Sequence, residues 1–528
     1  MKRVISAVLA LVLLAATSQG TAQQVAPELK LILLISIDQM RFDYVTRFRS
    51  EFTAGFDRLL TQGAVFTDAQ LEHYPTVTAV GYATMLTGAT PAVSGIIGND
   101  WYDRTTGTQV TSVSDKNHRT IGQAGNASAS PHRLLVTTVG DELKAATSTF
   151  GAASSRVIGV SLKDRASVLM AGHNADAAYW YDQASGAFVS STYYFSRPPT
   201  WVDAFNDRKG ADRYAGAIWE TLDGSAKRQL PESPGRRLYT AVYGSPFGNE
   251  LLLGFAQEVI TQAKLGQRDV TDLLGVSFSA NDTVGHAYGP DSPEVHDVTV
   301  RADAIVGALL AYVDKAVGLE HTLVALTSDH GVAPLPEVLT ARGREAGRQD
   351  PRLLPGTIQQ ALVDRFGEGQ WNLSTAGSSP YLNYGLIAER GLKVADVRKV
   401  AAEAAERVPH VARVYTRDQL ARGDVRGDRI SQRVLRSFNT ERSGDLEILL
   451  DQNWMRLAAG TTHGTAYDYD SHIPLILMGP GIRPGQYKDS VALNDLAPTL
   501  AALAGIKAPS GSSGRVLTEA LLLAGRRD

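Results

Sequence analysis

Residues 31–38 read Leu-Ile-Leu-Leu-Ile-Ser-Ile-Asp, an apolar run that ends in a carboxylate. A continuous apolar run of this length is typical of a β-strand buried on both faces, as strands of parallel sheets are. Further runs of the same kind are Val157–Ser161, Leu273–Phe278, Thr322–Thr327 and Ile473–Met478. Helical patterns occur at Phe255–Ala263, Ala302–Val317 and Val397–Arg407. Buried strands that alternate with helices predict an α/β fold around a mostly parallel sheet.

Acidic residues and histidines follow three of these runs at their carboxyl ends. Asp38 follows the first run, and Asp282 and His286 come shortly after Phe278. Asp329 and His330 follow Ser328, which is the first residue after the run Thr322–Thr327. A single Asp after a strand is usually a turn or cap residue. Because ligands of open α/β sheets bind outside the carboxyl ends of the strands, three such coincidences favour one common site.

The spacing of these residues constrains how they could bind an ion. Asp282 and His286 are four residues apart and could share one face of a helical turn. Gly285 lies between them, so we expect this turn to be short or irregular. Adjacent Asp329 and His330 can bind one ion only if the strand ends there. Carboxylate and imidazole without thiolate suit a catalytic zinc site, although manganese or another divalent ion is chemically possible.

The composition excludes several classes of protein. The chain of 528 residues has no cysteine, which excludes disulfides, Cys-ligated zinc and a cysteine nucleophile. With 52 basic and 55 acidic residues the net charge is −3, so no nucleic-acid partner is expected. A hydrophobic fraction of 44% is that of an ordinary globular protein.

The N-terminal residues 1–22 have the pattern of a signal peptide. Lys2 and Arg3 form a basic region, Val4–Ala16 an apolar region, and Gly20-Thr-Ala22 a small-residue cleavage site. The apolar region is short for a membrane span, although an uncleaved anchor is the alternative. We therefore expect a periplasmic or secreted protein without a membrane anchor after cleavage.

A second group of residues, 73–88, predicts a helix that begins after Pro75 and ends before Gly88. Thr78 falls at the start of this helix, where its hydroxyl could be an ordinary N-cap. A helix N-terminus also stabilises an anion such as an alkoxide or a phosphoryl group. Thr76 and Thr84 are rival hydroxyls, and the spacing does not choose among the three.

With these motifs in view, the sequence resembles the alkaline phosphatase superfamily. Within it, the chain is similar to bacterial alkaline phosphatases with a single Thr nucleophile, which are related to nucleotide pyrophosphatases/phosphodiesterases. The matching motifs are Ile35-Ser-Ile-Asp38, Pro75-Thr-Val-Thr78, Gly95-Ile-Ile-Gly-Asn99, Asn281-Asp282 with His286, Ser328-Asp-His-Gly331, Thr462-His-Gly464 and Asn494-Asp-Leu-Ala-Pro-Thr-Leu500. The resemblance implies a three-layer sandwich, with residues 23–528 as one catalytic domain and inserted loop or cap segments around 100–155, 185–250 and 340–455.

The resemblance also implies two Zn2+ ions per chain. One would be held by Asp282, His286 and His463, and the other by Asp38, Asp329 and His330, with Thr78 also touching it. His463 lies in a loop that the strand-end argument does not reach, and His472 is its rival as a ligand.

Substrate choice depends on Lys163 and Arg165, which follow the strand Val157–Ser161. From the residues alone they could belong to a solvated loop. In the resembling phosphatases a Lys-x-Arg pair binds the oxygens of a phosphate monoester, and Asn99 would add a hydrogen bond. Tyr82 stands where many relatives have His, which leaves the fine substrate preference open.

The resemblance thus implies a zinc-dependent phosphate monoester hydrolase that acts on small molecules through a phosphothreonine at Thr78. The two metal ions would assist an in-line displacement. The alternatives are a phosphodiesterase/nucleotide pyrophosphatase on the same scaffold and, from another class, an inactive periplasmic metal-binding protein. A sulfatase is disfavoured, because formylglycine formation needs a Cys or a Ser-x-Pro-x-Arg sequence, and neither is present.

Overall fold

The computed structural model describes residues 28–122, 129–148, 154–374 and 379–522. The predicted signal peptide, residues 1–22, lies outside the described residues. Within the described ranges, no helix combines the length and the apolar character that a membrane crossing requires.

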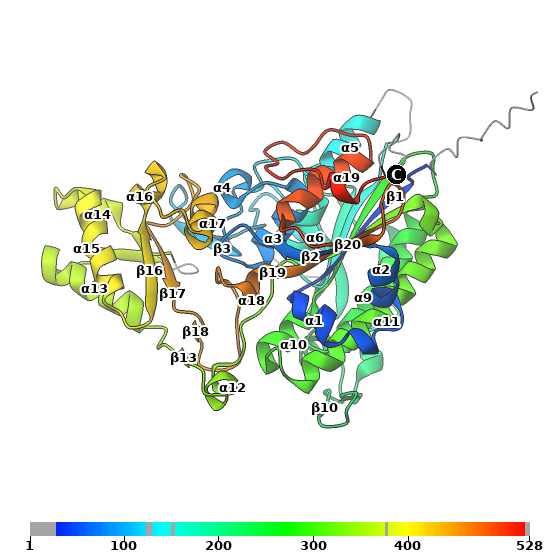
Figure 1. Cartoon of the computed structure of the whole chain (residues 1–528), viewed down its shortest axis with the longest axis horizontal. Coiled ribbons are helices and arrows are strands. Elements are labelled where there is room, and N and C mark those ends of the chain that lie inside the picture. Colours follow the sequence, from blue (N-terminus) through cyan, green and yellow to red (C-terminus); the bar gives the residue numbers. More distant parts are fainter. Residues whose placement is uncertain (1–27, 123–128, 149–153, 375–378, 523–528) are drawn as a thin grey trace, which may run out of the picture.

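An eleven-stranded sheet forms the centre of the larger lobe (Figure 1). Its middle strands are parallel and lie in the order β12 (Thr322–Thr327), β1 (Leu31–Ile37), β11 (Asp272–Phe278), β6 (Val157–Ser161) and β7 (Ala177–Asp182). Beyond β12 come β19 (His472–Met478), β2 (Ala64–Gln70) and then β20 (Gly485–Tyr487), with β21 (Val491–Ala492) also paired to β2. Beyond β7 come β8 (Ala187–Ser191) and β5 (Thr120–Ile121).

The five strands predicted from apolar runs are confirmed, with ends that differ by no more than one residue. The mostly parallel sheet is confirmed as well, although β19 runs antiparallel to β12 and β2. The three predicted helices coincide with the later parts of α9 (Pro246–Gln262), α11 (Pro293–Ala316) and α15 (Val394–Glu406), each of which ends one residue earlier than predicted.

Helices cover both faces of the sheet, and alternate side chains of β1 show how the layers divide. Leu33 and Ile35 pack into one core with α9, α11 and α2 (Gly55–Gln62). Ile32 and Leu34 pack into a second core on the opposite face. That core includes α3 (Thr78–Thr87), α5 (Val139–Thr147), α6 (Asp164–Ala171) and α19 (Leu496–Leu503). The result is the three-layer α/β sandwich that the family resemblance implied.

The register of the central strands sets the position of the residues that follow them. In β1, Ile37 lies opposite Phe278 of β11, and Ser36 lies opposite Thr327 of β12. Because these strands are parallel and end level with one another, the residues after them emerge at one edge of the sheet.

The predicted insertion at 340–455 contains a second, smaller lobe with a hydrophobic core of its own (Figure 1). Its main elements are α13 (Leu353–Phe366), α15, β16 (Val411–Thr416) and β17 (Leu446–Leu450). Its core includes Ile358, Trp371, Val397 and Ile448, all with at most 1% of their surface exposed. The division of residues 23–528 into one domain with insertions stays a prediction.

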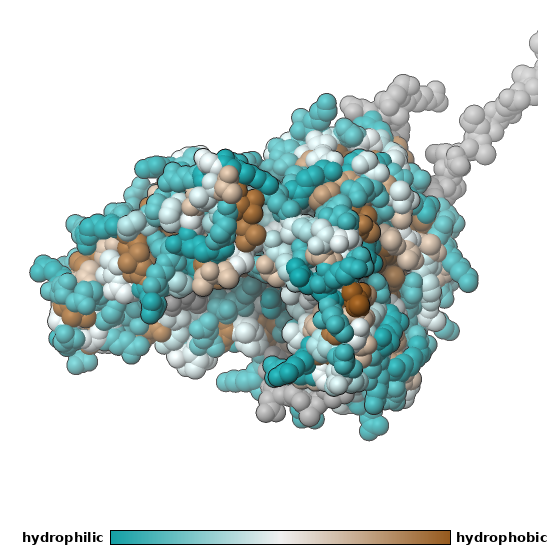
Figure 2. Space-filling model, turned by 90° about the horizontal axis from the view of Figure 1, so that it is seen from below, coloured by the Kyte–Doolittle hydropathy of each residue, from teal (hydrophilic) through white to brown (hydrophobic). Residues whose placement is uncertain are grey.

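Hydrogen bonds and a small apolar cluster connect this lobe to the segment that precedes α3. The hydroxyl of Tyr74 donates to the carbonyl of Ile448 at 3.0 Å, and the Tyr74 N–H donates to Ser437 Oγ at 2.8 Å. The ring of Tyr74 belongs to a small buried cluster with Tyr415 and Val434. On the outside, the face in Figure 2 is mostly hydrophilic and shows apolar residues only in small patches.

Gly81 of α3 lies very close to the backbone of Asp329, the second residue after the end of β12. A Cβ at position 81 would lie 2.3 Å from the carbonyl oxygen of Asp329. We therefore expect Gly81→Ala to lower the free energy of unfolding by about 1–3 kcal/mol, as overpacking of a tight interior does. Urea denaturation followed by circular dichroism measures this change.

The matched control is Gly254→Ala in α9, where a Cβ would meet no atom within 4 Å. Alanine is favoured over glycine in a helix interior by up to about 1 kcal/mol, so this variant should be neutral or stabilised. Equal destabilisation of both variants would contradict the close approach of α3 and Asp329.

Candidate active site

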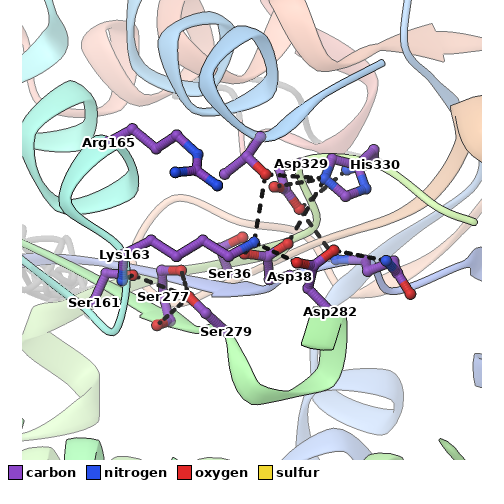
Figure 3. A network of polar contacts seen from close by, with 12 residues as sticks. Ser36, Asp38, Ser161, Lys163, Arg165, Ser277, Ser279, Asp282, Asp329 and His330 are labelled. Atoms are coloured by element: carbon purple, nitrogen blue, oxygen red, sulfur yellow. Dashed lines mark hydrogen bonds and ion pairs between the residues drawn. The ribbon is translucent and has the colours of Figure 1, made fainter. Parts of the chain in front are cut away.

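Three buried carboxylates meet at the edge of the sheet where β1, β11 and β12 end (Figure 3). They belong to Asp38, Asp282 and Asp329, of which none exposes more than 6% of its surface. Lys163 follows the neighbouring strand β6, and its Nζ lies 2.7 Å from Asp38 Oδ2 and 2.6 Å from Asp282 Oδ2. Residues that follow four strands therefore lie at one place, and the strand-end argument had related three of these strands to a common site.

Asp282 lies in α10, which runs from Ala280 to Tyr288. The expectation of a short or irregular turn is confirmed as to length, since α10 has nine residues and ends before Gly289, although the helix continues regularly through Gly285. A glycine inside a helix costs only about 1 kcal/mol, which the burial of Ala280 and Val284 outweighs. The predicted i, i+4 pairing is confirmed, with His286 Nε2 3.2 Å from Asp282 Oδ1.

Asp329 and His330 follow β12 in a turn, as predicted. Asp329 Oδ2 lies 3.2 Å from His330 Nε2, so both side chains face the same centre. The turn is tight at Gly331, where a Cβ would come within 2.2 Å of the carbonyl oxygen of Tyr469. Glycine is therefore required there by the close approach of another chain segment.

His463 joins the group from a loop of distant sequence. Its Nε2 lies 3.7 Å from Asp282 Oδ1, and its ring stacks on that of His330 with 3.5 Å between centroids. Asp470 anchors the loop by accepting hydrogen bonds from the N–H and the hydroxyl of Thr465, both at 2.7 Å. The rival His472 instead begins β19 and contacts the carbonyl of Thr67 at 3.0 Å.

The three histidines share one orientation. Nδ1 of His286 lies 2.7 Å from the carbonyl of Thr461, Nδ1 of His330 lies 2.9 Å from that of Gly331, and Nδ1 of His463 lies 2.8 Å from that of Thr76. A carbonyl can only accept, so each Nδ1 carries a proton and each Nε2 is the ring atom that faces the carboxylates and can offer a lone pair to a metal ion when it is deprotonated. Ligating histidines are held in this way by a second hydrogen bond.

The electric field of the site favours cations. Burial alone would lower the pKa of His330, but the neighbouring Asp329 raises it to about 9. Burial also opposes the charge of Lys163, yet Asp282 and Asp38 hold its pKa above the usual range. His463 differs, because burial and the adjacent histidines depress its pKa well below normal and keep the ring neutral.

The residues present fit divalent metal ions. Three carboxylates against the one ammonium of Lys163 are costly to bury without further positive charge. Asp38 Oδ1 is buried without a hydrogen-bond partner, and Asp38 Oδ2 and Asp329 Oδ2 are contacted through ion pairs with Lys163 and His330. Ligand atoms lie within 4.8 Å of one another in two groups, Asp282 with His286 and His463, and Asp38 with Asp282 and His330. Asp282 thus lies between the two groups.

Thr78 is the hydroxyl that faces this centre. It is the first residue of α3, and the N-cap is Val77, so the N-cap interpretation of Thr78 was wrong. Its Oγ1 lies 3.4 Å from both Lys163 Nζ and His330 Nε2. Thr76 instead donates to the carbonyl of Thr465 at 2.7 Å. Thr84 also points elsewhere, with its hydroxyl 3.4 Å from the carbonyl of Ala89.

The other predicted residues lie around this hydroxyl. Asn99 Oδ1 accepts a hydrogen bond of 2.9 Å from the N–H of Ala79 in the first turn of α3. The amide nitrogen of Asn99 therefore points away from this N–H. Arg165 is the second residue of α6, and its guanidinium is directed toward the carboxylates (Figure 3). Tyr82 is fully buried, and its hydroxyl lies 2.6 Å from Ser277 Oγ, so it is placed beneath the site.

One residue of this centre was not found from sequence. Gln39 has a left-handed backbone with φ of 66°, and its N–H donates to Asp329 Oδ1 at 3.1 Å. Its Nε2 donates to Asp282 Oδ1 at 2.6 Å, so the residue connects two of the carboxylates. A glutamine after a strand-end aspartate carries no signal of this role, because the contacts cross more than 240 residues.

Comparison with known proteins identifies the family and several relatives of the chain. A family model described as type I phosphodiesterase / nucleotide pyrophosphatase matches residues 32–468. The chain is 34% identical to alkaline phosphatase PhoV of Synechococcus elongatus, over 93% of each chain. It is also 34% identical to alkaline phosphatase PafA of Elizabethkingia meningoseptica, over 94% of this chain and 95% of that one.

The fold agrees with these matches. A crystal structure of wild-type alkaline phosphatase PafA superposes with a TM-score of 0.87 and 33% identity, over 94% of this chain and 100% of that one. The chain therefore belongs to the type I phosphodiesterase/nucleotide pyrophosphatase family, and with it to the alkaline phosphatase superfamily of enzymes that its motifs indicated.

Proposed function

We propose that this phosphoester hydrolase is a zinc-dependent alkaline phosphatase that cleaves phosphate monoesters through Thr78. The observation that carries the proposal is one hydroxyl within 3.4 Å of a buried lysine and of a histidine in a carboxylate–imidazole cluster. Relatives named alkaline phosphatase, similar over more than nine-tenths of the chain, support the same reaction.

Two zinc ions would bind the two groups of ligands. One group is Asp282, His286 and His463. The other would be Asp38, Asp329 and His330, with Thr78 beside it; Asp329 takes the place of the shared Asp282 here, since its Oδ2 lies 3.2 Å from His330 Nε2. When bound, such ions supply Lewis acidity, which favours an ionised hydroxyl and offsets negative charge on the phosphoryl oxygens. The buried Asp38 Oδ1, which accepts no hydrogen bond, and the direction of the histidine Nε2 atoms toward the carboxylates support this assignment.

The chemical steps are assigned to residues of the chain itself. Thr78 Oγ1 attacks phosphorus in line, and its bond to phosphorus forms as the bond to the leaving alcohol breaks. The product is a phosphothreonine and the free alcohol. Water then attacks the same phosphorus, so that inorganic phosphate leaves and the hydroxyl of Thr78 is restored.

Lys163, Arg165 and Asn99 favour a monoester over a diester. A monoester dianion carries charge that the second ester group of a diester removes. Lys163 offers a point charge 3.4 Å from Thr78 Oγ1, and Arg165 offers a guanidinium fork directed to the same place. Preorganised donors of this kind stabilise the equatorial oxygens in the transition state.

The second candidate is a phosphodiesterase or nucleotide pyrophosphatase on the same scaffold, which the description of the matching family favours. A third, from another class, is an inactive metal-binding protein, against which the complete set of ligands and the positioned hydroxyl argue. We also propose export to the periplasm or beyond, on the sequence of residues 1–22.

Removal of divalent ions is expected to abolish hydrolysis of a phenyl monoester and to lower the melting temperature. The reason is that three buried carboxylates would lose their counter-charge. A ligand at 100 to 1,000 times its Kd stabilises a protein by about 3–4 kcal/mol, so zinc add-back should restore both properties. Elemental analysis, thermal unfolding and turnover measure this, with calcium and magnesium as comparison ions. Full turnover in protein verified as metal-free would contradict the proposal.

Thr78→Ala is expected to reduce kcat for monoesters by about 10⁴-fold or more, as loss of a nucleophile does. Zinc content should stay near that of the wild type, since the charged ligands remain. Trapping with a 32P-labelled monoester at low pH should give labelled wild-type protein and unlabelled variant.

The matched controls are Thr84→Ala and Thr76→Ala, which remove neighbouring hydroxyls from the same segment. Both should keep the label, although Thr76→Ala should lose some activity because its hydroxyl holds the loop of His463. Loss of label in Thr76→Ala with label retained in Thr78→Ala would show that the nucleophile is misassigned.

Arg165→Ala is expected to lower kcat/KM for a phenyl monoester by about 10²–10³-fold, the usual effect of removing one transition-state donor. The loss for a bis-phenyl diester should be less than about tenfold, because a diester carries less charge for Arg165 to bind. Arg165→Lys keeps the charge but loses the bidentate guanidinium, so its kcat/KM for the monoester should lie between those of the wild type and Arg165→Ala. Equal losses on both esters, or a wild-type preference for the diester, would favour the phosphodiesterase.

A further inference from the structure

A cavity of about 480 Å³ lies beside the proposed catalytic residues and has no part in the steps described above. One wall belongs to the segments around Thr78 and the metal ligands, and includes Val77, Asn99 and His463. The opposite wall is built mainly by the 340–455 insertion. It includes Ser379, Tyr381, Val434, Glu447, Leu449, Trp454 and Leu457.

The location of the cavity relates it to the leaving group. Among the proposed metal ligands, His463 is the one whose residue lines the cavity, and Val77 directly precedes the nucleophile. The cavity therefore begins at the phosphoryl site on the side of His463 and extends toward the second lobe. An ester bound through its phosphoryl group at Thr78 would have this space open to its alcohol.

The walls are suited to a flat apolar group. Trp101 and Tyr381 are almost fully buried and line the cavity. The ring of Trp454 stacks on His410 with 3.2 Å between centroids and an angle of 9°. The hydroxyl of Tyr381 donates to the carbonyl of Arg442 at 2.8 Å. These contacts fix the positions of aromatic rings that line the cavity.

The cavity wall also carries polar groups, among them the carboxyl of Glu447 and the guanidinium of Arg456. Glu447 accepts a hydrogen bond from Ser379 Oγ at 2.7 Å. Burial raises the pKa of Glu447 to about 7, although the bond from Ser379 acts in the opposite direction. Its side chain keeps some accessible surface, which the cavity provides. A carboxyl in such a place binds an N–H or O–H donor of a ligand.

We propose that this cavity binds the alcohol part of the substrate and selects phosphate monoesters of alcohols that carry a flat ring system with a hydrogen-bond donor. The proposal rests on the monoesterase function proposed above. Ligand pockets for organic molecules occupy about 300–1,000 Å³, so a three-carbon alcohol would fill only a small part of this one. The insertion at 340–455 would thus supply the substrate-selective wall.

The test compares three monoesters of primary alkyl alcohols, whose leaving groups are similar. They are adenosine 5′-monophosphate, naphthylmethyl phosphate and glycerol phosphate. We expect kcat/KM of the wild type to be at least about tenfold higher for the two ring esters, since one buried aromatic contact contributes about that factor. A similar kcat/KM for glycerol phosphate would overturn the proposal.

Variants of the second lobe separate the ring contact from the polar contact. Trp454→Ala, and Leu457→Ala at the rim, should lower kcat/KM for both ring esters and leave that for glycerol phosphate within about threefold. Glu447→Ala should act on adenosine 5′-monophosphate but not on naphthylmethyl phosphate, which has no donor. Equal losses on all three esters would show that these residues only support the phosphoryl site, and would overturn the proposal.

Binding without turnover keeps the two proposals distinguishable. Adenosine and naphthylmethanol should each bind the wild-type protein in calorimetry and bind Leu457→Ala and Trp454→Ala more weakly, whether or not any monoester is hydrolysed. Binding without monoester hydrolysis would support the cavity and reject the proposed reaction. Hydrolysis without binding of either alcohol would reject the cavity and leave the reaction in place.

Discussion

The repulsion among three buried carboxylates is the constraint on which the rest of this centre depends. Asp38, Asp282 and Asp329 lie close together in a space that excludes water, and such an arrangement is stable only with compensating positive charge. Lys163 supplies one such charge, and the Nε2 atoms of His286 and His330 face the same carboxylates. The fold therefore has a metal-binding character that follows from electrostatics before any reaction is considered.

The parallel sheet makes this concentration of charge possible. Four neighbouring strands end level with one another, so the residues after them converge without long loops. The helix α3 adds Thr78 from one face, packed so closely that Gly81 touches the backbone of Asp329. Nucleophile and ligands are thus held by the rigid core of the molecule. The second lobe contributes only the outer wall, which suits it to substrate selection.

Much of this centre could be predicted because its signals are local. The apolar runs located the strands within one residue, and the carboxylates that follow them carried the site. Gly88, predicted to follow the helix, also gave the correct end of α3. His463 was reached only through the resemblance to a known family, and Gln39 was not reached at all. Both contribute through contacts between segments hundreds of residues apart, which leave no periodic pattern.

The sequence by itself determined the α/β class, the strand ends and the types of ligand, because buried strands and missing thiols are properties of composition and order. Only the tertiary structure decided which of three threonines faces the centre, that α10 is regular, and that His463 rather than His472 joins it. It also showed that the long insertion forms a lobe against the cavity. These outcomes depend on packing between distant segments, where burial outweighs local propensity.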